Sequence, residues 1–200
     1  LAMKFVVSLQ TDFGDIRWAK ENNKILDDSL ITGCSSIYKS LDCAISIYRT
    51  LGHDTKSLVK AKELLKTCLL ENVERFDRSW KSKKRYSMDW YYPVMCGVVK
   101  GTKAKEKMQS RWDEFVIDGM GCKCVVEEPW VTIAESSELV VALVVIGEVD
   151  KAKELFEWLH QWKDPKDNLY WTGYVYTDQK YWPVEKPTWT AAAVLIAADS

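Results

Sequence analysis

The chain has 200 residues, of which 47% are hydrophobic and 28% are charged. This length and apolar content are enough to bury a sizeable core, so we expect one domain over residues 1–200, with the six cysteines as free thiols of a cytoplasmic protein. The 28 basic and 29 acidic side chains give a net charge of −1. This balance argues against nucleic acid as a partner, because phosphate binding needs a basic excess.

Three short glycine-bearing connections recur at a spacing of about 50 residues: Leu51–Thr55, Lys100–Thr102 and Gly147–Asp150. Each follows an apolar helical stretch and precedes a lysine-rich amphipathic one. The amphipathic helices are predicted at Met3–Leu9, Leu58–Cys68, Ala104–Phe115 and Ala152–Trp162, and the buried helices at Ile37–Tyr48, Pro93–Val99, Thr132–Ile146 and Trp189–Ala198. The pattern predicts repeated helical hairpins. Because the longest apolar run, Leu139–Gly147, is far shorter than the roughly 20 residues of a membrane-spanning helix, we expect no membrane span.

The connections that return to each buried helix are long and rich in Trp, Tyr, Asp, Gly and Pro. They cover Thr11–Ile31, Phe76–Asp89, Ile117–Pro129 and Lys163–Pro187. Long ordered loops that lead into the same end of successive buried helices are expected to form one functional face. Strand content should be small, with a short ribbon near Tyr170–Tyr176.

Acidic and aromatic residues recur together before the buried helices. Examples are Asp89-Trp90-Tyr91-Tyr92-Pro93 and Glu127-Glu128-Pro129-Trp130. An acid near a helix start is first of all a capping and helix-dipole device. The repeated aromatic neighbours favour, in addition, a binding face.

The order of inner helix, tight turn, outer helix and long loop resembles the six-hairpin alpha/alpha toroids, which include terpene cyclases, protein prenyltransferase beta subunits and many glycoside hydrolases. Phe5-Val6, Gln10 and Gly14 followed by Trp18 resemble the QW repeat of the squalene-cyclase branch, although that Trp normally follows the Gly by two residues. Further segments resemble an uncharacterised bacterial prenyltransferase-like or squalene-cyclase-like group: Ser35–Tyr38, Ser87–Pro93, Pro129–Thr132 and Trp189–Ala193. The resemblance implies an all-α fold, a full or partial toroid in which any missing hairpins are N-terminal.

The residues required for isoprenoid chemistry are not found in the expected patterns. Squalene-type cyclisation uses an Asp-x-Asp-Asp motif, whereas Asp27-Asp28 has no third acid at that spacing. A prenyltransferase zinc site needs Asp, Cys and His together, yet His53 and His160 are predicted to lie on the surface, and Cys122-x-Cys124 is too closely spaced. We therefore expect no metal and no cofactor.

Carbohydrate chemistry fits the residue inventory better. Glycoside hydrolysis uses two carboxyl groups, and aromatic rings offer flat apolar platforms for sugars. The predicted catalytic acids are Asp89, Glu135 and Glu185. The predicted substrate-binding residues are Asp28, Trp90, Tyr91, Tyr92, Glu128, Trp130, Trp171, Tyr174, Trp182 and Trp189. The alternative for about half of the tryptophans is packing between hairpins.

The leading hypothesis is therefore a protein that binds or acts on a saccharide or another small molecule in an aromatic and acidic cleft, as a glycosidase-like hydrolase if it is an enzyme. An enzyme acting on isoprenoids or lipids is one alternative. A non-catalytic scaffold that binds a protein is the other. Since an incomplete ring of hairpins leaves apolar sides exposed, a homo-oligomer is also expected.

Overall fold

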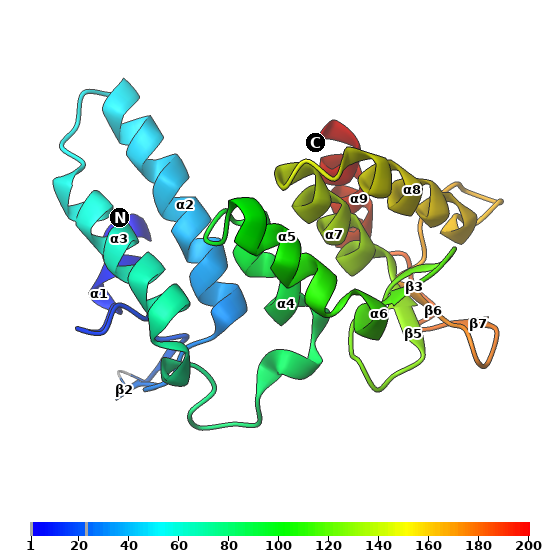
Figure 1. Ribbon diagram of the computed structural model, residues 1–200, viewed down its shortest axis with the longest axis horizontal. Helices are drawn as coiled ribbons and strands as arrows, with labels where there is room; N and C mark the ends of the chain where they lie inside the picture. The colour runs from blue at the N-terminus through cyan, green and yellow to red at the C-terminus, as the bar shows by residue number, and fades with distance from the viewer. Residues whose placement is uncertain (1, 23) are drawn as a thin grey trace. The chain divides into compact units, whose positions relative to one another are not determined.

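The computed structural model describes residues 2–22 and 24–200 and is mainly helical (Figure 1). Two compact units are distinguished. Unit 1 comprises the described part of residues 1–83 together with Cys96–Val99, and unit 2 comprises Lys84–Met95 and Lys100–Ser200. One domain over residues 1–200 stays a prediction. In the described part of the chain, no helix combines the length and the apolar character needed to cross a bilayer.

Unit 1 is built on one helical hairpin. Its helices are α1 (Ala2–Ser8), α2 (Ile31–Thr50) and α3 (Lys56–Glu71), with a ribbon of β1 (Lys20–Glu21) and β2 (Lys24–Ile25) and a 3-10 turn at Val73–Arg75. Leu41 of α2 and Leu65 and Cys68 of α3 are fully buried where the two helices pack together. The hairpin predicted around Leu51–Thr55 is confirmed.

Unit 2 places three inner helices side by side. Its helices are α4 (Ser87–Met95), α5 (Gly101–Ser110), α6 (Trp112–Phe115), α7 (Ile133–Val145), α8 (Val149–Leu159) and α9 (Thr188–Asp199). A 3-10 turn lies at His160–Trp162, and another, at Lys83–Arg85, begins with the last residue of the first segment of unit 1. The inner helix α7 contacts both α4 and α9, while α5 packs on α4 and α8 packs on α7 (Figure 1). Ile133, Leu139 and Leu143 of α7 are almost completely buried. The hairpin repeat predicted from sequence is therefore confirmed.

A three-stranded antiparallel sheet contacts α7. It orders β5 (Trp130–Thr132), β6 (Gly173–Val175) and β7 (Lys180–Tyr181), and a separate ribbon joins β3 (Val116–Ile117) to β4 (Gly121–Cys122). One cross-strand row joins Trp130, Val175 and Lys180, and the next joins Val131, Tyr174 and Tyr181. Since side chains alternate along strands, these rows face opposite sides of the sheet. Tyr174 and Tyr181 pack against the core cluster of α7 and α9.

Several predicted boundaries are wrong. The helix predicted at Pro93–Val99 begins at Ser87, because the Ser87 amide donates to the Cys124 carbonyl (3.0 Å) and the helix buries Trp90. The helix predicted at Ala104–Phe115 is interrupted at Arg111, and Thr132 ends a strand instead of starting a helix. The predicted ribbon near Tyr170–Tyr176 is one part of the larger sheet. Tertiary contacts, which periodicity does not report, set these boundaries.

Gly14 packs directly against α3 with φ +104°. A Cβ atom at this position would lie 2.3 Å from the Leu64 carbonyl oxygen. Gly52 provides a contrast, since its φ is +71° and no atom lies within 4 Å of its added Cβ. We expect Gly14→Ala to lower the free energy of unfolding by about 3 kcal/mol and Gly52→Ala by about 1 kcal/mol, because only Gly14 adds a backbone clash to conformational strain. Chemical denaturation of both variants measures the difference. Equal losses would contradict this assignment.

Candidate active site

Two carboxylates lie on the first two turns of α7. Glu135 and Glu138 are three residues apart on the same helix face, and both are half-buried. Glu135 is a predicted catalytic acid, whereas Glu138 was missed. The sequence signal for Glu138 is its spacing of one helical turn from Glu135 on an otherwise apolar helix. A carboxylate in such a position is costly unless its oxygens are hydrogen-bonded.

The helix α4 supplies the hydrogen bonds that Glu138 requires. Tyr91 donates its hydroxyl to Glu138 Oε2 (2.5 Å), and Tyr92 donates to Oε1 (2.8 Å). The two phenol rings lie 5.5 Å apart at an interplanar angle of 40°. Both oxygens of Glu138 are therefore fixed by a neighbouring inner helix, which sets the orientation of this carboxylate.

The surroundings of Glu138 raise the pKa of this residue and of two neighbours, Cys124 and Tyr91. Burial raises the pKa of Glu138; the two tyrosine hydrogen bonds oppose this shift, and the charge of Glu135 adds to it. Burial, followed by the Glu135 carboxylate, also raises the pKa of the Cys124 thiol. The pKa of Tyr91 is raised by its burial and then by Glu138 and Glu135. A raised pKa is the direction of shift that general acid catalysis requires of a carboxyl group.

The other two predicted catalytic acids have different surroundings. Asp89 is buried in the first turn of α4. Burial lowers the pKa of Lys107 on α5, and the charge of Asp89 opposes this shift without reversing it. The Glu185 side chain is exposed, and its Oε1 accepts a 3.5 Å hydrogen bond from the Thr172 hydroxyl. Both residues belong to unit 2, as do Glu135 and Glu138.

A groove of about 630 Å³ follows the outer face of the three-stranded sheet. It brings together three predicted binding residues, Glu128, Trp130 and Trp182. The indole N–H of Trp130 donates to the Trp182 carbonyl (2.8 Å), and the two rings meet edge to face with centroids 4.9 Å apart. The complete lining is Arg85, Val125, Glu128, Pro129, Trp130, Val175, Thr177, Asp178, Lys180 and Trp182. The groove therefore combines an aromatic surface with charged side chains in the same lining.

Trp90 and Tyr91, both predicted to bind substrate, are enclosed by their neighbours. Trp90 is 1% exposed, stacks on Phe115 at 5.5 Å and donates its indole N–H to the Lys107 carbonyl (2.7 Å). Tyr91 is 0% exposed. Rings enclosed in this way have no face open to a ligand, so both residues pack between helices, as expected for part of the aromatic set.

The remaining predicted aromatic residues lie on or near the sheet. Trp171 stacks on Tyr181 with centroids 4.9 Å apart, and Lys186 lies over its ring at 4.4 Å. Tyr174 stacks on Trp162 at 4.5 Å, on the core side of the sheet. Trp189, in the first turn of α9, is 63% exposed. A role in ligand binding for these residues stays a prediction.

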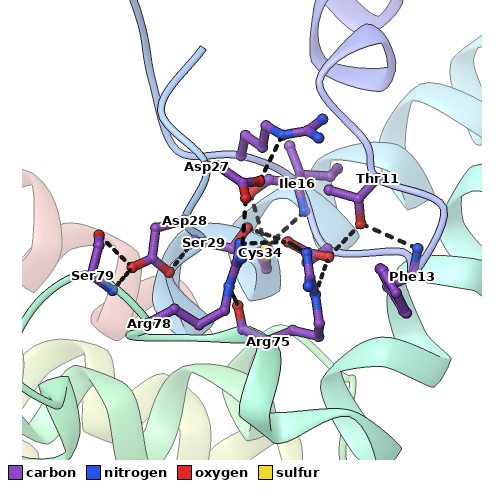
Figure 2. Close-up of polar contacts among 12 residues, drawn as sticks. Thr11, Phe13, Ile16, Asp27, Asp28, Ser29, Cys34, Arg75, Arg78 and Ser79 are labelled. Carbon is purple, nitrogen blue, oxygen red and sulfur yellow. Dashed lines mark hydrogen bonds and ion pairs between the residues drawn. The ribbon is translucent and has the colours of Figure 1, made fainter.

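Asp28 belongs to unit 1, where it links two loops. Its Oδ1 accepts from the Ser29 amide (2.7 Å), and its Oδ2 accepts from the Ser79 amide (2.5 Å) and hydroxyl (2.7 Å), as Figure 2 shows. Its neighbour Asp27 is exposed and forms a 3.2 Å ion pair with Arg78 (Figure 2). Burial acts to raise the pKa of Asp28, but these hydrogen bonds outweigh it and lower the pKa. The observed contacts of Asp28 are those of a loop clamp.

Asp15, which the sequence did not single out, is the most buried acid of this network. It is 0% exposed and accepts hydrogen bonds from Thr11, from the Ser29 hydroxyl (2.7 Å) and from Arg75 Nε (3.1 Å). Burial alone would raise the pKa of Asp15, but the three donors and the Arg75 charge lower it below 3.8. A buried charge satisfied in this way holds the loop before α2 against the segment after α3.

We expect Asp15→Asn to lower the free energy of unfolding by about 3 kcal/mol at neutral pH, because it leaves Arg75 without its charged partner. A lowered pKa in the folded state gives stability that is present above the unfolded value of 3.8 and is lost as the pH falls through the folded value. The gap between variant and parent should therefore close as the pH falls below 3.8. Urea titrations at several pH values measure it, with the exposed Asp12→Asn as control. A gap independent of pH would contradict the assignment.

Comparison with known proteins gives one curated relative and solved structures of similar fold. The chain is 41% identical over 199 residues to the MMP endo-(1,4)-3-O-methyl-alpha-D-mannosidase of Mycolicibacterium hassiacum; the match covers 100% of this chain and 54% of the relative. The chain thus spans about half the length of this relative. No family model matches the sequence.

Two structures of the GH76A alpha-1,6-mannanase from Salegentibacter sp. HEL1_6 are similar to the chain. The free enzyme has a TM-score of 0.63 at 18% identity, covering 98% of this chain and 61% of the mannanase. An inactive variant in complex with alpha-1,6-mannotetrose has a TM-score of 0.65 at 16% identity, covering 98% and 60%. These matches do not show the narrower resemblance to a squalene-cyclase-like group. They do show that the helical hairpins have the alpha/alpha-toroid type of fold.

Proposed function

We propose that this chain is part of a glycoside hydrolase that cleaves internal bonds of an α-mannoside polymer. The observation that carries the proposal is the 41% identity to an endo-mannosidase, which extends over the whole of this chain. The similarity in fold to α-mannanases supports the same substrate class. These relatives favour a saccharide over the isoprenoid and scaffold alternatives.

Glu135 is our candidate for the acid that protonates the leaving oxygen. Glycoside hydrolysis requires one carboxyl group that donates a proton and a second that attacks the sugar or activates water. Glu135 lies beside a second half-buried carboxylate, Glu138, whose orientation is fixed by Tyr91 and Tyr92. Glu138 would act as a positioning residue, because both of its oxygens are already engaged by the two tyrosine hydroxyls.

Asp89 remains our proposal for the second carboxylate, and Glu185 is the alternative. Asp89 follows the loop into α4, the helix that also carries Tyr91 and Tyr92, and its charge interacts with that of Lys107. A carboxylate with a nearby cation suits the role of base or nucleophile, which acts in its ionised form. Glu185 would enter from the loop before α9, where Thr172 orients it.

The first test replaces the proposed proton donor. Glu135→Gln should lower kcat on α-mannoside oligosaccharides roughly 100-fold to 10,000-fold, because general acid catalysis contributes about that factor. Glu154→Gln, an exposed change on α8, is the matched control and should leave kcat unchanged. Release of reducing ends is measured with the protein at its natural length, on 3-O-methylated α-(1,4)-mannosides and on α-1,6-mannan. Full activity of Glu135→Gln would refute its role, and no hydrolysis of either substrate by the parent would refute the function.

The second test separates catalysis from structure at Asp89. Asp89→Asn should abolish turnover and leave the thermal unfolding temperature close to that of the parent, because the amide has the same shape. Turnover and Tm are measured on the same preparation. A large drop in Tm, with unchanged turnover per folded molecule, would make Asp89 a structural partner of Lys107 instead.

A further inference from the structure

The groove on the sheet has an apolar floor and a charged rim. The floor follows from strand register: Trp130 and Val175 share one cross-strand row, which faces away from the core. Trp182, 53% exposed, continues this surface after β7, and Val125 and Pro129 complete it. The floor of the groove therefore consists of two indoles and three aliphatic side chains.

The charges at the rim are largely engaged with one another. Arg85 Nε lies 3.2 Å from Glu127 Oε2, and Lys180 Nζ lies 2.7 Å from Asp178 Oδ2. Paired charges at the edge of the groove can orient a ligand. A sugar hydroxyl buried against the indoles would lose its hydrogen bonds to water and gain none from the floor, which is unfavourable. The groove therefore fits a saccharide whose inner edge is apolar.

Gly173 fixes the position of the Trp130 ring. A Cβ at residue 173 would lie 2.3 Å from Trp130 Nε1 and 2.7 Å from the Val131 carbonyl oxygen. The indole therefore rests directly on the bare backbone of β6, while its N–H bonds the Trp182 carbonyl (2.8 Å). Such a ring is pre-organised, so ligand binding does not have to order it.

We propose that this groove is a saccharide subsite that selects O-methylated hexose units of the substrate chain. The inference rests on the proposed function, and it deepens it by assigning recognition of the methyl groups to Trp130 and Trp182. O-methylation removes a hydroxyl donor and adds a methyl group. Each methyl buried on the indoles should tighten binding roughly fourfold relative to the free hydroxyl.

Equilibrium binding of two non-hydrolysable probes tests the subsite. The probes are thio-linked α-(1,4)-mannotetraose with and without 3-O-methyl groups, titrated calorimetrically into the full protein. The parent should bind the methylated probe roughly tenfold more tightly, and Trp182→Ala should bring the ratio of the two affinities close to one. Trp18→Ala, which removes an exposed indole of unit 1 that does not line the groove, should keep the parent's ratio.

Gly173→Ala provides a second route to the same result, since it displaces Trp130 without removing a groove side chain. It should also reduce the ratio, with circular dichroism to establish that the variant is folded. Equal affinities of the parent for both probes, or an unchanged affinity ratio in a folded Trp182→Ala variant, would overturn the subsite. Hydrolysis by the parent would still support the proposed function in that case. A methyl preference that depends on Trp182, without any hydrolysis by the parent, would support the subsite and overturn the proposed function.

Discussion

The two hydrogen bonds from Tyr91 and Tyr92 to Glu138 are the interaction on which the candidate active site depends. A carboxylate facing a packed inner helix is strongly unfavourable unless both oxygens find donors. Here the donors come from α4, so α4 and α7 must be in register before Glu138 is tolerated. The same contact joins α4 to α7, the helix that also carries Glu135. The packing of α4 against α7 thus also sets the geometry of the candidate active site.

The three-stranded sheet separates core from groove by alternation. Tyr174 and Tyr181 point to the core side, where Trp162 stacks on the first at 4.5 Å. Trp130 and Val175 point the other way and form the groove floor. Because a strand cannot shift by one residue without exchanging its faces, the packing that holds Tyr174 inside also holds Trp130 at the groove.

Unit 1 also contains buried acids whose oxygens are satisfied by hydrogen bonds. Asp15 is completely buried and is satisfied by Thr11, Ser29 and Arg75, and Asp28 is satisfied by Ser29 and Ser79. These bonds hold two long loops against the α2–α3 hairpin, beside the apolar contacts that Ile16 and Phe76 make with its core. Both units therefore rely on acids before or within the first turns of inner helices, either as loop clamps or as members of the candidate site.

The helical hairpins, their turns and the acids near the starts of inner helices could be predicted from the sequence, because helical periodicity and glycine turns are local signals. It also predicted Glu135, Trp130 and Trp182 as candidates. Only the tertiary structure decided that Trp90 is enclosed, that α4 begins at Ser87 and that Glu138 is held by two tyrosines. The hydrogen bonds behind these three features join residues 17, 37 and 47 positions apart, and no local pattern encodes such pairings.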